Sequence, residues 1–182
     1  MQKLTSCKSG EIPGFFMQKY YIKYKFFDFY DGERNFFIYN NMSKSKTKSF
    51  LKLLQQEFPH LNFKTDECFR GHTTFGIGGK IAIYVEVEKP SDIIRLVKIL
   101  NREEVRYFIL GLGSNILADD QFHDMVVIKN NIKGITIRGD KVVCGAGESI
   151  ARLNNVAMEN SLSGLEWSYG IPGSVGGAVK NN

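Results

Sequence analysis

The chain has 182 residues, of which 43% are hydrophobic, 18 are glycine and 4 are proline. This composition is typical of a globular domain and excludes a collagen-like or wholly disordered chain. Its net charge of +5 comes entirely from residues 1–48, which hold 9 Lys/Arg and 4 Asp/Glu, whereas residues 49–182 hold 15 of each. The larger part therefore lacks the basic footprint of a nucleic-acid-binding protein.

The sequence shows no sign of a membrane span, a secretory signal or a metal site. No apolar run approaches the ~18–20 residues that cross a bilayer, and no apolar stretch near the start is followed by a small-residue cleavage site. Cys7, Cys68 and Cys144 are scattered and form no Cys-x-x-Cys pair, which indicates isolated thiols. We therefore expect a cytoplasmic protein.

Residues 1–41 form an atypical leader that holds 12 of the 23 aromatic residues in the chain, without a period of two or 3.6. This segment is too aromatic for ordinary disorder. Three interpretations remain open: a strand-forming extension, a basic and aromatic segment that lies on a membrane surface, or upstream sequence included by a wrong start, with Met42 as the true first residue.

Regular periodicity begins after Met42. Residues 49–58 are predicted to form a short amphipathic helix, whose apolar face is Phe50, Leu53, Leu54 and Phe58. Residues 81–88 alternate, which predicts a half-buried strand. Its buried face is expected to hold Ile81, Ile83, Val85 and Val87. A second helix is predicted from Pro90 to about Asn101, with Ser91 as its N-cap. Its apolar stripe is Ile93, Leu96, Val97 and Leu100.

The second half alternates short strands and turns. Strands are predicted over 106–110 and 125–129, and a hairpin over 135–138 and 142–144 that turns at Gly139-Asp140. Residues 149–160 are predicted to form a helix, with Ile150, Leu153, Val156 and Ala157 facing inward. Residues 163–182 are rich in glycine and have no clear assignment. Mixed helices, strands and hairpins without a strict βαβ alternation favour an α+β domain over a Rossmann sheet.

Three glycine-rich segments follow predicted strands or turns: residues 73–79 (TTFGIGG), 111–115 (GLGSN) and 170–178 (GIPGSVGGA). Glycine permits positive φ and close approach of a ligand to the backbone, and free N–H groups in such turns bind anions. Each segment alone reads as a tight turn, and none is a Walker loop or a Gly-x-Gly-x-x-Gly motif that opens a helix. Together they indicate a site for a phosphorylated cofactor.

The same segments resemble the bacterial UDP-N-acetylenolpyruvoylglucosamine reductases. The matching pieces are TTFGIGG (73–79), LGLGSNIL (110–117), the GAG turn (145–147) and SGLEWSYGIPGSVGGAV (163–179). The resemblance covers residues 73–182, a truncated FAD-binding domain, whereas residues 42–72 correspond to a short N-terminal lead. It implies an α+β fold of the vanillyl-alcohol-oxidase and p-cresol-methylhydroxylase type, with FAD between two subdomains.

The resemblance also implies the cofactor site. FAD is expected to bind noncovalently, with its diphosphate at the loop that starts at Gly111, and its ribityl chain and isoalloxazine ring beside the loop that starts at Gly170. The implied cofactor-binding residues are Ile77, Gly78, Gly79, Gly111, Gly113, Ser114, Asn115, Ile116, Leu117, Gly170, Ile171, Pro172, Gly173, Ser174, Val175, Gly176, Gly177 and Ala178. A covalent link through His72 is not favoured, because a lone histidine is usually a polar surface or core residue.

The chemistry implied by the resemblance has two halves. NADPH reduces FAD, and hydride then passes to the enol ether of UDP-N-acetylglucosamine enolpyruvate, which gives UDP-N-acetylmuramate for peptidoglycan. The family uses a serine as proton donor, helped by an arginine and a glutamate, and all three would lie beyond Asn182. We therefore expect no catalytic residue in this chain, no C-terminal substrate domain, and a fragment or truncated product that is inactive alone.

Other interpretations stay open. The chain could be a noncatalytic flavin-binding remnant, or part of a different oxidoreductase with the same type of flavin domain. Phe75, Trp167 and Tyr169 are interpreted as core or pocket-wall residues, and Glu166 is given no role. A monomer is expected, with a UDP-sugar as the partner of the complete site and no nucleic acid.

Overall fold

The computed structural model describes residues 44–181, so the three interpretations of the leader fall outside the described residues. The described chain forms two compact units, residues 44–131 and residues 132–181. Both mix helices with strands, which confirms the α+β class. No helix among these residues is long and apolar enough to cross a membrane.

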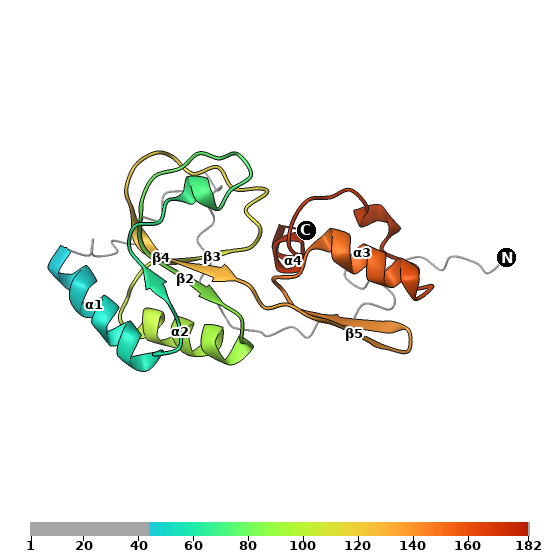
Figure 1. Ribbon diagram of the computed structural model, residues 1–182, viewed down its shortest axis with the longest axis horizontal. Helices are drawn as coiled ribbons and strands as arrows, with labels where there is room; N and C mark the ends of the chain where they lie inside the picture. The colour runs from blue at the N-terminus through green and yellow to red at the C-terminus, as the bar shows by residue number, and fades with distance from the viewer. Residues whose placement is uncertain (1–43, 182) are drawn as a thin grey trace. The chain divides into compact units, whose positions relative to one another are not determined.

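The unit of residues 44–131 is built on a four-stranded sheet with the order β1-β2-β4-β3 (Figure 1). Its strands are β1 (Phe63–Lys64), β2 (Ile81–Val87), β3 (Tyr107–Leu110) and β4 (His123–Asn130). Strands β2, β4 and β3 are parallel to one another, and β1 is antiparallel to β2. The sequence did not indicate this pairing, because β4 inserts between two strands that precede it in the chain.

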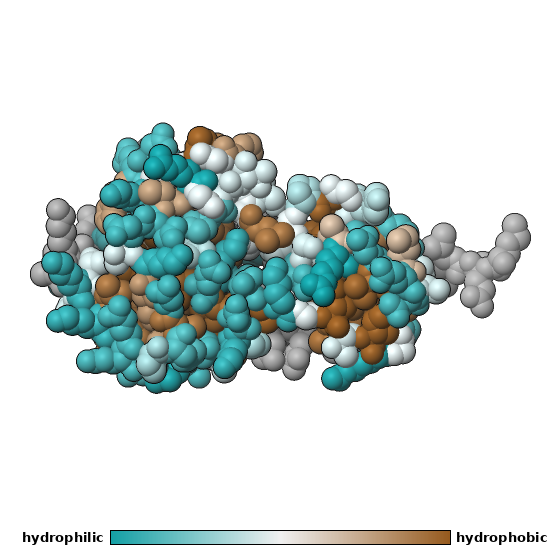
Figure 2. Space-filling model, viewed as in Figure 1, coloured by the Kyte–Doolittle hydropathy of each residue, from teal (hydrophilic) through white to brown (hydrophobic). Residues whose placement is uncertain are grey.

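Helices cover one face of this sheet. These helices are α1 (Lys44–Glu57) and α2 (Pro90–Arg102). The opposite face of the sheet carries the 3-10 helix η1 (Phe69–Gly71) and the loops around it (Figure 1). The outward faces of α1 and α2 are mainly polar (Figure 2). The guanidinium of Arg95 in α2 pairs with Glu57 of α1 and lies 5.0 Å from the ring centroid of Phe58, which joins the two helices.

Two sequence predictions for this unit are wrong. Strand β2 is not half-buried, because helices cover one face and η1 the other. Tyr84, which strand alternation places on the face opposite Ile83 and Val85, is fully buried, and among the residues of β2 only Glu86 is exposed. The N-cap of α2 is Lys89, not Ser91, because Pro90 takes the first helical position, where its missing N–H costs nothing. The predicted apolar stripe of α2 is buried and gains Ile99.

The unit of residues 132–181 combines a hairpin with short helices. The hairpin is β5 (Ile135–Arg138) and β6 (Lys141–Cys144), as predicted, with Gly139 at φ +63° in its turn. The helices are α3 (Ile150–Glu159), η2 (Glu166–Ser168) and α4 (Val175–Asn181). Ser149 caps α3 by accepting the N–H of Arg152 at 3.1 Å. Val142, Ile150, Leu153 and Val175 form the core. Figure 2 shows apolar atoms over the hairpin and α3.

Candidate cofactor site

In the unit of residues 44–131, the Gly111 segment lies at the carboxyl end of a parallel strand. The segment that starts at Gly111 directly follows β3, and open α/β sheets bind ligands at this edge. The structure brings it against the segment of residues 73–79: the N–H of Thr74 donates to Gly113 O at 3.1 Å. A Cβ at Gly113, where φ is +74°, would lie 2.1 Å from His72 O. Only glycine therefore allows this approach.

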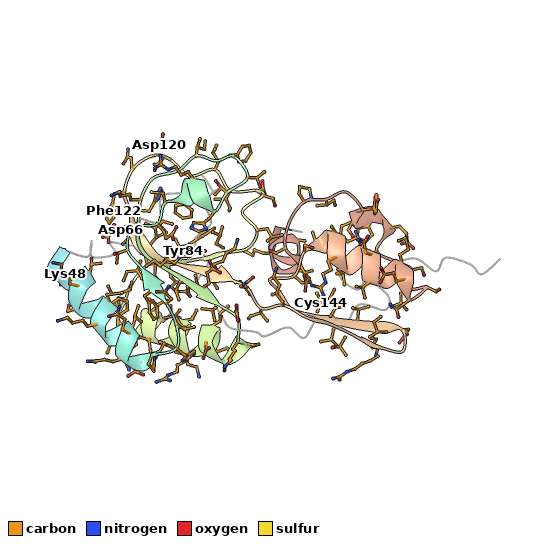
Figure 3. The ribbon with its side chains drawn as sticks, in the orientation of Figure 1. Lys48, Asp66, Tyr84, Asp120, Phe122 and Cys144 are labelled. Carbon is orange, nitrogen blue, oxygen red and sulfur yellow. The ribbon has the colours of Figure 1, made fainter. Side chains whose placement is uncertain are left out.

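Gly78 and Gly79 are explained by packing within the same unit. A Cβ at Gly79 would lie 1.9 Å from Gln121 O, and a Cβ at Gly78 would lie 2.6 Å from Phe69 Cβ. The N–H of Gly78 also donates at 3.3 Å to the carboxylate of Asp120, whose side chain is labelled in Figure 3. These two glycines let the segment lie against the chain that enters β4, and this contact accounts for them without a ligand.

The Gly111 loop presents donors that the chain does not use. Within the described part of the chain, no hydrogen bond is donated by the backbone N–H groups of four of its residues, which are Gly113, Asn115, Ile116 and Leu117. Successive backbone N–H groups without partners are the donor set that phosphate oxygens require. Asn115 and Leu117 are exposed, Leu117 by 72%, whereas Ile116 is half-buried and Gly113 is buried, so the part of the loop open to a ligand runs from Asn115 to Leu117.

A lysine that no sequence motif indicates completes this edge. Lys129, near the end of β4, donates from Nζ to Gly111 O at 2.5 Å and so places a positive charge at the base of the loop. Lys129 and Gly111 are 18 residues apart, and only the parallel register that pairs Leu110 with Lys129 brings them together. No local sequence pattern indicates this contact.

A polar cluster adjoins the segment of residues 73–79. It consists of Lys64, Glu67, His72 and Tyr84. The ring of His72 stacks on Tyr84 with centroids 4.2 Å apart, and its Nε2 lies 2.8 Å from Glu67 Oε2. Hydrogen bonds from Lys64 and His72 lower the pKa of Glu67. Burial, followed by the charge of Glu86, raises the pKa of Tyr84. His72 is therefore engaged in holding its own segment.

In the unit of residues 132–181, the structure brings the GAG turn and the Gly170 segment together. The N–H of Gly176 donates to Ala146 O at 2.8 Å, and a Cβ at Gly176 would lie 2.9 Å from the same oxygen. The N–H of Ile150 donates to Gly173 O at 3.0 Å, and that of Val175 donates to Glu148 O at 2.8 Å. Helix α4, which the sequence left unassigned, begins at Val175 on this support.

The remaining predicted residues of this segment divide into anchored and open positions. Ser174 and Val175 are buried, and the N–H of Gly177 donates to Ser174 Oγ at 3.2 Å. Gly170 has φ +81° with no atom within 4 Å of a Cβ placed there, and Ile171 is 42% exposed. The segment thus has a fixed end at α4 and an open end at Gly170. Open backbone of this kind admits a ligand in close approach.

Glu148 supports the fixed end and was also missed from the sequence. It is 3% exposed, and its carboxylate accepts the N–H of Gly134 at 3.1 Å and the N–H of Ser149 at 3.2 Å. Burial acts to raise its pKa, but these hydrogen bonds and the charges of Arg152 and Lys133 outweigh burial and lower the pKa. A charged carboxylate therefore joins the start of β5 to the start of α3.

Exposure excludes one of the two interpretations given to Trp167, Tyr169 and Phe75. They are 57%, 78% and 60% exposed, so they are not core residues. This leaves the pocket wall as their interpretation. Glu166 accepts the N–H of Gly164 at 2.7 Å through its carboxylate, a local structural contact.

Comparison with known proteins agrees with these observations. A family model described as "FAD binding domain" matches residues 81–182. A UDP-N-acetylenolpyruvoylglucosamine reductase from Clostridium kluyveri is 34% identical over 139 residues, which are 76% of this chain and 46% of the relative. A relative of the same name from Syntrophomonas wolfei is 40% identical over 126 residues, 68% of this chain and 42% of the relative.

A solved structure shows the same fold. The crystal structure of the UDP-N-acetylenolpyruvylglucosamine reductase of Thermus caldophilus matches with a TM-score of 0.50 and 31% identity, over 65% of this chain and 41% of that chain. The match thus spans less than half the length of these relatives. The chain belongs to the family of FAD binding domains and, within it, to the N-terminal FAD-binding part of the UDP-N-acetylenolpyruvoylglucosamine reductase family.

Proposed function

We propose that this chain binds FAD noncovalently, as the flavin-binding part of an NADPH-dependent reductase that converts UDP-N-acetylglucosamine enolpyruvate to UDP-N-acetylmuramate. The observation that carries the proposal is the set of unpartnered N–H groups of the Gly111 loop at the carboxyl ends of parallel strands. This donor set suits the diphosphate of FAD. The relatives, all named as UDP-N-acetylenolpyruvoylglucosamine reductases, support the reaction.

The residues of the chain have distinct parts in this proposal. The backbone of Asn115, Ile116 and Leu117 donates to diphosphate oxygens, while Lys129 fixes the loop and offsets their charge. The open backbone at Gly170 lies beside the ribityl chain and ring. When bound, FAD supplies the hydride chemistry. No residue of this chain is assigned the proton transfer, and the UDP-sugar, a cytoplasmic location and a monomeric state belong to the same proposal.

The test has two stages. The purified chain is titrated with FAD by calorimetry, and the complex is freed of excess FAD and examined for flavin absorbance. NADPH and the enolpyruvyl substrate are then added, and product is sought by mass spectrometry. Saturable FAD binding without turnover supports a flavin-binding part that lacks its proton donor. A chain that binds no FAD refutes the proposal, and turnover by the chain alone refutes the statement that no residue here transfers the proton.

A further inference from the structure

Two aromatic side chains on either side of a buried serine are unusually exposed. Trp167 is 57% exposed and Tyr169 is 78% exposed, whereas Ser168 between them is 3% exposed. Tryptophan side chains are on average largely buried in proteins. An exposed group of large apolar side chains commonly marks a binding surface. Ile171, two residues further on, adds a 42% exposed apolar side chain.

The backbone that carries these side chains is firmly held. Ser168 Oγ lies 2.9 Å from Asn154 Oδ1 in α3 and 2.8 Å from Leu165 O. The N–H groups of Ser168 and Tyr169 donate to Leu165 O and Glu166 O at 3.0 and 3.2 Å. The exposure of Trp167 and Tyr169 therefore follows from how η2 is fixed on α3, and is not the consequence of a loosely packed loop.

These aromatics lie next to the open end of the Gly170 segment. Gly170 follows Tyr169 directly, has φ +81°, and has no atom within 4 Å of a Cβ position. Beyond it, the segment is anchored through Gly173 O, which accepts the N–H of Ile150. The aromatic side chains therefore border backbone that is open to a ligand, in the part of the chain that matches the FAD binding domain.

We infer that Trp167 and Tyr169 form an aromatic platform that stacks on a planar ring of FAD, which deepens the proposed function and rests on it. Both ring systems of FAD, the isoalloxazine and the adenine, are flat aromatic heterocycles. Tryptophan and tyrosine stack on such rings with little loss of side-chain entropy, since they have only two rotatable bonds. Stacking of a base on an aromatic side chain is worth ~1–3 kcal/mol. The platform holds the ring, and the glycine backbone beside it allows the ring to approach.

The test compares FAD affinity among variants of the full chain. Trp167→Ala removes the platform, and Trp167→Phe keeps a flat ring in its place. Met158→Ala is the matched control, because Met158 in α3 is 71% exposed in the same unit and lies outside the platform. We expect Trp167→Ala to raise the Kd about 5- to 140-fold, from ~1–3 kcal/mol at ~1.4 kcal/mol per tenfold. Trp167→Phe should restore most of the affinity, and Met158→Ala should leave it unchanged. Tyr169→Ala and Tyr169→Phe repeat the comparison for the second ring.

Spectroscopy identifies the ring, since Trp167 is the only tryptophan of the chain. If the isoalloxazine stacks, FMN emission is quenched more strongly by the wild type than by Trp167→Ala. If the adenine stacks, ADP changes the Trp167 emission, and FMN emission is equal in the two proteins. Wild-type FAD binding with an unchanged Kd in Trp167→Ala and Tyr169→Ala overturns the platform and leaves the proposed function intact. Absence of FAD binding by the wild type overturns both.

Discussion

The close approach at Gly113 gives a sharp prediction, because the chain also contains its control. Gly113→Ala places a methyl group 2.1 Å from His72 O, on a residue with φ +74°. Gly76→Ala places the same methyl group on a residue with φ +66°, with no atom within 4 Å. Both glycines lie in the same unit and have nearly the same φ, so the two variants differ mainly in the contact with His72.

The two variants should differ by about 1 kcal/mol. An alanine in the left-handed region costs ~1–2 kcal/mol in either place. At Gly113 the methyl group must also move about 1 Å to reach an acceptable distance from His72 O, which breaks the hydrogen bond from Thr74 N–H to Gly113 O. A lost hydrogen bond adds ~0.5–1.5 kcal/mol. Gly113→Ala should therefore cost ~2–3 kcal/mol.

Urea denaturation followed by far-UV circular dichroism measures this difference. At ~1–3 kcal/mol per molar urea, the extra 1 kcal/mol lowers the midpoint by roughly 0.3–1 M beyond that of Gly76→Ala. Because the Gly113 loop must move away from His72 and Thr74, Gly113→Ala should also weaken FAD binding more than Gly76→Ala. Equal midpoints and equal FAD affinities for the two variants would refute the reasoning, because the contact with His72 would then affect neither stability nor FAD binding.

Three further predictions concern single side chains. Lys129→Met removes the cation that holds Gly111 O. By calorimetry it should raise the Kd for FAD roughly 12- to 140-fold, from the ~1.5–3 kcal/mol of a charged hydrogen bond; equal weakening by Lys129→Arg would argue against charge as the cause. The pKa of Glu148 is lowered in the folded chain, so its stabilisation is present above its unfolded pKa of ~4.3 and is lost as pH falls through the folded value. Urea titrations should show a cost of Glu148→Gln at pH 7 that shrinks below about pH 4; a pH-independent cost would contradict this reasoning. Burial raises the pKa of Cys144 to about 11, so its alkylation by iodoacetamide, followed by peptide mass spectrometry, should be slow near neutral pH and accelerate toward that pKa.

Much of the fold follows from local patterns. The stripe of α2, the hairpin at Gly139 and the inward face of α3 were predicted because amphipathic periodicity and turn chemistry act over a few residues. The error over β2 has a different cause. Helix α2 packs on one face of β2 and η1 on the other, where Phe69 of η1 covers Tyr84. A strand's own alternation does not report what covers each face.

The candidate site divides in the same way. The sequence by itself determined the three glycine-rich segments, their order, and the resemblance that led to FAD. Only the tertiary structure separated glycines that packing requires, such as Gly79 against Gln121 O, from Gly170, which faces open space. It also brought Lys129 to Gly111 and left Trp167 and Tyr169 outside the core. The physical reason is that periodicity and turn residues act between near neighbours in sequence, whereas strand register and burial are set by contacts between distant ones.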